Sequence, residues 1–136
     1  MSKGATLLTG GKKIDGPGAY VQPTLLADVT PDMRAYSEEL FGPAGVVYKV
    51  KSASEAVELA NSSVYGLSGS VWSSDLDSAR SVAADLDVGM AFVNEHGTTL
   101  PGLPFGGVKR SGVGRELGPW GMDEFVNKKL IRVSKK

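Results

Sequence analysis

Cysteine is absent from this sequence of 136 residues, and histidine occurs only once, at His96. The chain therefore has no disulfide, no thiolate metal ligand and no cysteine nucleophile of its own, and one histidine cannot build a multi-histidine metal site. No apolar run is long enough to span a bilayer, and residues 1–11 lack the apolar centre of a secretory signal. These absences predict a cytoplasmic protein without a metal centre.

An excess of charge is also missing, because fifteen basic residues balance fifteen acidic ones. A balanced surface does not attract nucleic acid or an anionic membrane, so neither is an expected partner. With 41% hydrophobic and 22% charged residues, the composition is that of a globular domain rather than of a disordered segment.

The middle of the chain alternates between strand-type and helix-type segments. Residues 45–50, 67–72 and 90–94 are short apolar runs typical of strands, and residues 53–62 and 75–86 between them have helical periodicity. Short connections of this kind join parallel strands by right-handed crossovers. We therefore predict an α/β fold with an open, mostly parallel sheet and flanking helices.

The helix predicted over 75–86 has both a start signal and an apolar face. Ser74 is predicted as its N-cap, because a serine side chain can accept a hydrogen bond from the first turn. The apolar residues on one side of this helix are Leu76, Ala79, Ala83 and Leu86.

The two ends of the chain are predicted to be extended. Residues 5–9 are predicted to form a short strand, and Pro23 indicates an edge or irregular strand over residues 19–29. Residues 31–40 are predicted to form a polar connector that is partly helical. Near the C-terminus, residues 129–134 are predicted to form a final strand whose flanking lysines protect an exposed sheet edge. The sequence shows no boundary of a second domain.

Residues 95–121 hold eight glycines and three prolines. A segment this long is unusual as a passive connection, so we predict a functional loop. Residues 106–118 lack the spacing of a dinucleotide fingerprint and follow no clear strand, which argues against a phosphate-binding loop. Their glycines are instead predicted to allow tight turns with positive φ.

From the residues alone, two candidate catalytic groups remain. Adjacent Glu38 and Glu39 can form an acid–base pair in which one carboxylate raises the pKa of the other, but a solvated pair is favoured because adjacent side chains rarely converge on one substrate. His96 is a candidate general base, although no motif places a nucleophile beside it. From residue spacing alone, an α/β binding module therefore remains one hypothesis for the function of the chain.

Two strings taken together resemble a known family. Residues 38–43, Glu-Glu-Leu-Phe-Gly-Pro, and residues 104–118, PFGGVKRSGVGRELG, are similar to two signatures of the NAD(P)-dependent aldehyde dehydrogenases. The combination of FVN at 92–94, LPFGGVKRSG at 103–112 and EFVNKKL at 124–130 is most similar to the succinate-semialdehyde branch. The resemblance implies that residues 1–128 are the C-terminal portion of the catalytic domain and residues 129–136 an oligomerisation strand and tail.

The resemblance implies that the catalytic groups of this family lie outside the matched segment. A cysteine thiolate attacks the aldehyde, hydride passes to the nicotinamide, and a glutamate-activated water hydrolyses the thioester. The resemblance places the cysteine, the base and the coenzyme domain upstream of the matched segment. We therefore expect an enzyme fragment that is inactive alone. The alternative is a non-catalytic protein that associates with full-length aldehyde dehydrogenase subunits.

Five residues match functional positions of the family. Glu39 matches a glutamate that hydrogen-bonds the nicotinamide ribose, and Phe41 matches the aromatic residue beside the nicotinamide ring. Phe105 matches a tunnel phenylalanine that borders substrate and coenzyme. Thr99 lies in the loop where several succinate-semialdehyde enzymes place a serine against the substrate carboxylate, and a threonine hydroxyl can do the same. Glu116 matches a glutamate proposed to relay protons to the base.

The resemblance implies NAD or NADP in the complete enzyme, and leaves the choice between them and the exact aldehyde open. Two hydrogen bonds that Glu39 accepts from the ribose hydroxyls would contribute about 1.5–3 kcal/mol each. Association costs about 4–15 kcal/mol, so we expect no coenzyme binding by this chain alone. The expected partner is a second copy, joined through the strand at 129–134.

Overall fold

The computed structural model describes residues 2–135 and divides into two compact units, one ending at Ser52 and the other beginning at Ala53. The sequence predicts no boundary at this position, since neither a change of composition nor a flexible linker marks it. Among residues 2–135, no helix is long and apolar enough to cross a membrane.

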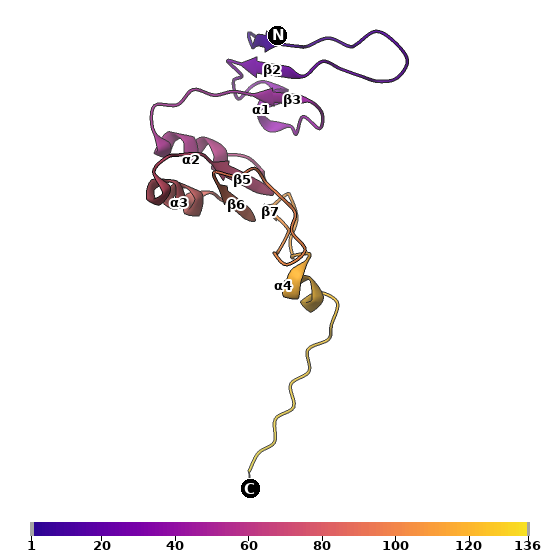
Figure 1. Ribbon diagram of the computed structural model, residues 1–136, viewed down its shortest axis with the longest axis vertical. Helices are drawn as coiled ribbons and strands as arrows, with labels where there is room; N and C mark the ends of the chain where they lie inside the picture. The colour runs from indigo at the N-terminus through magenta and orange to yellow at the C-terminus, as the bar shows by residue number, and fades with distance from the viewer. Residues whose placement is uncertain (1, 136) are drawn as a thin grey trace. The chain divides into compact units, whose positions relative to one another are not determined.

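The first unit is built on a three-stranded sheet. Its strands are β1 (Thr6–Thr9), β2 (Thr24–Ala27) and β3 (Ala44–Val46), in the order β1-β2-β3 (Figure 1). β1 pairs with β2 antiparallel, and β2 pairs with β3 parallel. The short helix α1 (Arg34–Ser37) lies between β2 and β3 in the sequence, inside the connector predicted to be partly helical.

The strand that follows Pro23 lies in the centre of this sheet. The edge strand predicted over residues 19–29 is therefore wrong, whereas the predicted irregularity is present: pairing is limited to Thr24–Ala27 and an isolated bridge at Val21, and the register with β1 shifts. β2 begins only at Thr24, so the proline precedes the strand and removes no hydrogen bond from its ladder.

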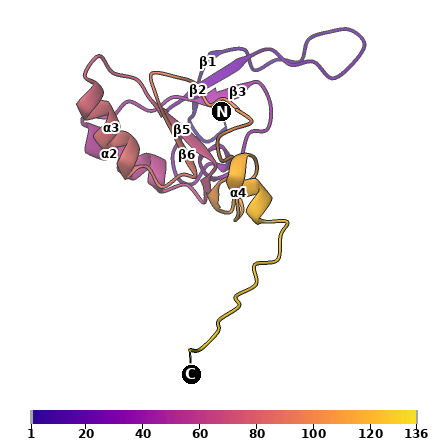
Figure 2. The same cartoon turned by 60° about the horizontal axis from the view of Figure 1, so that its bottom comes forward.

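The second unit contains two small sheets and three helices. Strands β5 (Ser68–Val71) and β6 (Met90–Val93) pair in parallel, and β4 (Tyr65–Gly66) pairs antiparallel with β7 (Val108–Lys109). The helices are α2 (Ala53–Asn61), α3 (Leu76–Asp85) and α4 (Gly118–Asp123). Figures 1 and 2 show α2 and α3 side by side next to β5 and β6, and α3 packs on both strands.

The α/β class, the parallel pairing and the flanking helices are confirmed. The expected single sheet through residues 45–50, 67–72 and 90–94 is wrong in detail, because β3 pairs with β2 whereas β5 and β6 form a sheet of their own. Short apolar runs indicate that strands form but do not specify which strands become neighbours.

Helix α3 is capped one residue later than predicted. The Asp75 carboxylate accepts hydrogen bonds at 3.1 Å from the backbone N–H groups of Asp77 and Ser78, so Asp75 is the N-cap in place of Ser74. Ala79 and Ala83 are buried as predicted, but Leu76 is 51% exposed because it lies at the first turn.

The core of each unit is small. Among residues 2–135 the buried apolar side chains are Val29, Met33, Ala79 and Ala83, and many larger apolar side chains are exposed. Exposed apolar surface is typical of faces that are covered by another part of a protein or by a partner.

The C-terminal tail leaves α4 and runs outward in both views (Figures 1 and 2). Residues 127–135 form no strand within this chain, so the strand predicted over residues 129–134 is wrong for the single chain. Its proposed partner is a neighbouring subunit, and that pairing stays a prediction. Residue 136 lies outside the described part of the chain.

Candidate functional site

Phe105 and Glu116 lie side by side in the second unit. The backbone N–H of Phe105 donates to the Glu116 carbonyl at 2.8 Å, and the N–H of Glu116 donates to the Phe105 carbonyl at 2.7 Å. Two reciprocal bonds of this kind fix the backbone of both residues at once. We call these two residues the Phe105–Glu116 pair.

Arg115 joins the two ends of the loop between Phe105 and Glu116 by hydrogen bonds from its side chain. One nitrogen of its guanidinium, Nη1, donates to the Gly107 carbonyl at 2.8 Å and to the Gly114 carbonyl at 2.7 Å. Gly114 itself has a φ of 82°, a conformation that favours glycine. Residues 106–118 are called the glycine-rich segment from here on, and the predicted positive φ is found at four of its glycines: Gly106, Gly112, Gly114 and Gly118.

The start of β6 packs directly against this segment. A Cβ atom on Gly89 would lie 2.0 Å from the Gly106 carbonyl oxygen and 2.6 Å from the Gly107 Cα. Only glycine allows backbone to approach backbone this closely. The glycine-rich segment is thus seated on the β5–β6 sheet through main-chain atoms.

Phe105 borders two cavities. The first has a volume of about 280 Å³ and is lined by the Phe105–Glu116 pair with Arg115, Glu124 and Phe125 among others. The second has a volume of about 200 Å³ and is lined by residues of β6, by Thr99 and by Phe105. Each is smaller than the roughly 300–1,000 Å³ of a typical ligand pocket.

Thr99 reaches the second cavity through a turn at the end of β6. Asn94 has a φ of 55°, and its side-chain amide both donates to the Ser73 carbonyl and accepts from the Ser73 N–H, each at 2.8 Å. These two bonds fix the direction in which the chain leaves the strand. The Thr98 hydroxyl then donates to the His96 carbonyl at 3.1 Å.

His96 is exposed and lines neither of these two cavities, so the structure gives it no catalytic neighbour there. In the part of the chain that the structure describes, no three His, Cys, Asp or Glu side chains are grouped so that they could hold a metal ion.

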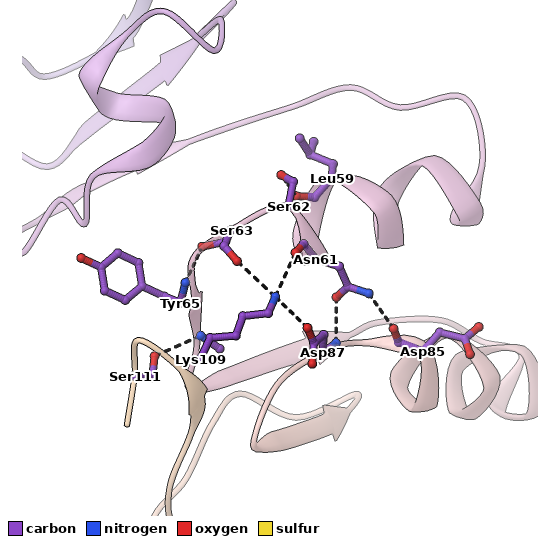
Figure 3. Close-up of polar contacts among 10 residues, drawn as sticks. Leu59, Asn61, Ser62, Ser63, Tyr65, Asp85, Asp87, Lys109 and Ser111 are labelled. Atoms are coloured by element: carbon purple, nitrogen blue, oxygen red, sulfur yellow. Dashed lines mark hydrogen bonds and ion pairs between the residues drawn. The ribbon is translucent and has the colours of Figure 1, made fainter. Parts of the chain in front are cut away.

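A group of polar residues anchors the other side of the glycine-rich segment (Figure 3). The ammonium of Lys109 donates to the carbonyls of Asn61 at 2.9 Å and Ser63 at 3.1 Å, and lies 3.0 Å from the Asp87 carboxylate. The Asn61 amide donates to the Asp85 carbonyl at 2.8 Å and accepts from the Asp87 N–H at 2.7 Å. We call these five residues the lysine cluster.

The backbone of Lys109 adopts a φ of 56°, which is uncommon for a residue with a long side chain. A conformation of this kind costs about 1–3 kcal/mol, and hydrogen bonds that involve a charged group contribute about 1.5–3 kcal/mol each. The bonds of the ammonium therefore offset the strain. Sequence reasoning missed Lys109, because nothing in a run of residues signals a positive φ at a lysine.

The first unit holds the remaining candidate residues. Arg34 donates from Nε and Nη2 to the two carboxylate oxygens of Glu38 at 2.8 and 2.7 Å. The hydrogen bonds from Arg34 lower the pKa of Glu38. The Glu38 carboxylate is thus occupied by Arg34, and its pKa is shifted away from the raised value that an acid–base pair with Glu39 would need, which favours the solvated alternative.

Glu39 and Phe41 follow α1 at the surface of the first unit. Glu39 is exposed, and Phe41 is 95% exposed. Of the five predicted site residues, the structure brings Thr99, Phe105 and Glu116 together around the two cavities of the second unit. Glu39 and Phe41 lie two positions apart in the first unit.

Comparison with known proteins agrees with the two signatures. The sequence model of the Aldehyde dehydrogenase family matches residues 1–131. A succinate-semialdehyde dehydrogenase [NADP(+)] of Deinococcus radiodurans is 61% identical over 132 residues, which are 97% of this chain and 28% of that protein.

Solved structures give the same result. The succinic semialdehyde dehydrogenase of Streptococcus pyogenes, solved with NADP+, aligns with a TM-score of 0.94 at 49% identity, over 98% of this chain and 30% of that one. The betaine aldehyde dehydrogenase of Staphylococcus aureus, solved with NAD+, aligns with a TM-score of 0.86 at 36% identity, over 99% of this chain and 29% of that one. The chain spans less than a third of the length of these relatives, and it belongs to the aldehyde dehydrogenase family.

Proposed function

We propose that this chain supplies the latter part of the catalytic domain of an enzyme that oxidises succinate semialdehyde to the acid with NAD or NADP. The observation that carries the proposal is the position of Phe105, which borders one cavity together with Thr99 and another together with Glu116. The names of the relatives in D. radiodurans and S. pyogenes support the same substrate.

The substrate has an aldehyde at one end and a carboxylate at the other. A hydroxyl can donate a hydrogen bond to a carboxylate oxygen, and this is the role that we assign to Thr99. Phe105 supplies an apolar wall that limits the access of water to the reacting carbon. Glu116 is exposed at the first cavity, where its carboxylate can take up a proton and pass it on.

The coenzyme would be held partly by the first unit. Glu39 can accept hydrogen bonds from two vicinal hydroxyls of a ribose, and Phe41 can pack its ring against the nicotinamide. Both side chains fit these roles because both are exposed and available to a ligand. When bound, the coenzyme supplies the chemistry of hydride acceptance.

The sequence contains no cysteine, so the nucleophile must come from elsewhere, and we expect the chain alone to be inactive. The test is a chimera in which this chain replaces the matched 132 residues of the D. radiodurans relative. We expect the chimera to form NADPH from succinate semialdehyde and the isolated chain to form none. A folded but inactive chimera, or an active isolated chain, would count against the proposal.

Thr99→Val in the same chimera separates substrate recognition from catalysis. Loss of one hydrogen bond to a charged group should raise KM for succinate semialdehyde by roughly 10- to 100-fold. The KM for an uncharged aldehyde such as butanal should hardly change, because it offers no carboxylate to Thr99. An equal rise for both aldehydes would show that Thr99 supports the fold of the loop and does not contact the substrate.

A second candidate function is association with other subunits through the C-terminal tail. Leu130, Ile131 and Val133 are 89%, 76% and 86% exposed on an extended segment between lysines. Such a segment can add a strand to the edge of another sheet, in a second copy or in a full-length subunit.

We also assign the protein to the cytoplasm.

Light scattering of the chain and of a form that ends at residue 128 tests this association. We expect a concentration-dependent rise in mass for the full chain and a monomer for the shortened form. The same mass for both would exclude the tail as the site of association.

A further inference from the structure

The C-terminal end of helix α2 presents backbone oxygen atoms to the ammonium group of Lys109. The carbonyls of Asn61 and Ser63 lie at the C-terminal end of this helix, where carbonyl groups lack partners within the helix and the helix dipole is negative. The Asp87 carboxylate adds a full negative charge. Three oxygens thus face the ammonium of Lys109, which has three N–H donors (Figure 3).

Asn61 fixes the shape of this site. Its side-chain amide joins the Asp85 carbonyl to the Asp87 N–H, so the turn after α3 is held beside the end of α2. The backbone carbonyl of the same residue accepts from Lys109. The acceptors are therefore placed by the helical frame of the second unit, and the lysine comes to them from the glycine-rich segment.

The strand pairing of β7 is short, which makes this ammonium important. β7 pairs with β4 through two residue pairs, Tyr65 with Lys109 and Gly66 with Val108. Beyond these pairs, the Arg110 N–H donates to the Val64 carbonyl and the Ser111 hydroxyl accepts from the Gly66 N–H, each at 3.0 Å. Two-stranded pairings of this length are marginal in water, so the charged side chain contributes much of what holds the segment in place.

We propose that Lys109 is a positioning residue: its ammonium, held by the three oxygens of the lysine cluster, sets the place of the Phe105–Glu116 pair beside the β5–β6 sheet. Lys109 touches neither substrate nor coenzyme in this scheme and acts through the segment that it anchors. The inference rests on the proposed function for the roles of Phe105 and Glu116. The placement of the pair by Lys109 is a separate physical statement that can be tested without turnover.

The test is amide hydrogen exchange, followed by NMR, in the full chain and its Lys109→Ala variant. Removal of the anchor should speed exchange of the Phe105 and Glu116 amides by about 10-fold or more, because their reciprocal bonds then open locally. The amides of Met90 and Asn94, which donate to Leu67 and Val71, report on the β5–β6 sheet. Their exchange should change by less than about 3-fold.

Chemical rescue separates the ammonium from a general effect of truncation. n-Propylammonium replaces the three carbons and the ammonium that Lys109→Ala removes, so it can donate to the three oxygens and should restore slow exchange at Phe105 and Glu116. Tetramethylammonium at the same concentration has the same charge but no N–H donor and should not. Lys128→Ala is the matched control, since Lys128 is an exposed lysine that pairs with Asp123 at 2.8 Å outside this cluster.

Three results would overturn the proposal: unchanged exchange at Phe105 and Glu116, equal acceleration at Met90 and Asn94, or equal rescue by both ammonium ions. If Lys109→Ala fails to fold, Asp87→Asn removes one charge and should give a smaller acceleration confined to the same two amides. Uniform acceleration in that variant would also overturn it. An inactive chimera with the expected exchange pattern would refute the proposed function and leave the positioning by Lys109 intact.

Discussion

The two units hold their candidate residues in different ways. In the second unit, the Phe105–Glu116 pair is fixed by reciprocal backbone bonds and Arg115 closes the segment between them. In the first unit, Phe41 follows a helix of four residues and projects almost entirely into solvent. Residues of one signature are therefore fixed by contacts within their own unit, whereas the Phe41 side chain of the other signature makes almost none.

Packing explains part of this difference. In the second unit, α3 lies on β5 and β6 with the small buried residues Ala79 and Ala83, which allow a close approach between helix and sheet. In the first unit the buried side chains are Val29 and Met33, both after β2, and no helix longer than four residues covers the sheet within the described residues. Variants in each unit can test whether the second is the more rigid.

The largest effect is expected for Gly89→Ala. The added Cβ would overlap the Gly106 carbonyl oxygen at 2.0 Å, and backbone cannot move aside as a flexible side chain can. We expect a loss of roughly 3 kcal/mol or more in the unfolding free energy of the second unit. Tryptophan fluorescence measures this directly, because both tryptophans, Trp72 and Trp120, belong to that unit.

Gly102→Ala is the matched control for this variant. A Cβ on Gly102 would meet nothing within 4 Å, and its φ is not positive. Its stability should stay within about 0.5 kcal/mol of the parent. Equal losses in the two variants would show that the contact between Gly89 and the glycine-rich segment does not hold the second unit together.

Asn61→Ala should have the next largest effect. It removes both side-chain bonds that join α2 to the turn after α3, and it leaves the Asp85 carbonyl and the Asp87 N–H without this partner. We expect a loss of about 1–3 kcal/mol, measured by urea unfolding followed by tryptophan fluorescence. Asn127→Ala, at an exposed position of the tail, serves as the control and should be nearly neutral.

Asp75→Ala tests the cap of α3. Loss of the carboxylate that accepts from Asp77 and Ser78 should cost about 1 kcal/mol, whereas Asp75→Ser keeps an acceptor and should cost less. Thermal unfolding by circular dichroism can rank the three proteins. If alanine and serine destabilise α3 equally, the capping bonds do not contribute to its stability.

The smallest effect is expected in the first unit, from the Arg34–Glu38 ion pair. The pKa of Glu38 is lowered in the folded state, so the stability it contributes is present above the usual pKa of a glutamate and is lost as the pH falls through the lowered value. The difference between the parent and Glu38→Gln should therefore shrink from about pH 7 to about pH 3. Amide exchange at Val47, which donates to Leu26, can report it, and a difference that grows in acid would contradict this assignment.

Sequence patterns predicted where helices and strands form better than they predicted which strands pair with each other. The helices over 53–62 and 75–86 and the strand at 90–94 appear within one or two residues of their predicted bounds, because helical periodicity and glycine breaks are local signals. The pairing of β3 with β2 was not predicted, since it joins residues far apart in the chain. The N-cap was placed at Ser74 because serine and aspartate are both good caps, and only the geometry distinguishes them.

The candidate site divides in the same way. Resemblance to two signatures identified Phe105, Thr99 and Glu116, which line the cavities of the second unit, and no composition or spacing argument reached them. The contributions of Lys109 and Arg115 depend on backbone carbonyls that converge only after folding. Such contacts leave no trace in a single sequence, because any residue can supply a carbonyl.

The position of Asn61 has a consequence for producing the protein. Asn61-Ser62-Ser63 is an acceptor sequence for N-glycosylation, and its amide nitrogen lies 2.8 Å from the Asp85 carbonyl in the fold. A sugar added to the Asn61 amide of the nascent chain in a secretory host would have to fit between the ends of α2 and α3, and it would therefore oppose folding. Ser63→Ala abolishes the acceptor sequence yet keeps the carbonyl that Lys109 uses, so it is the substitution to make before the protein is secreted from such a host.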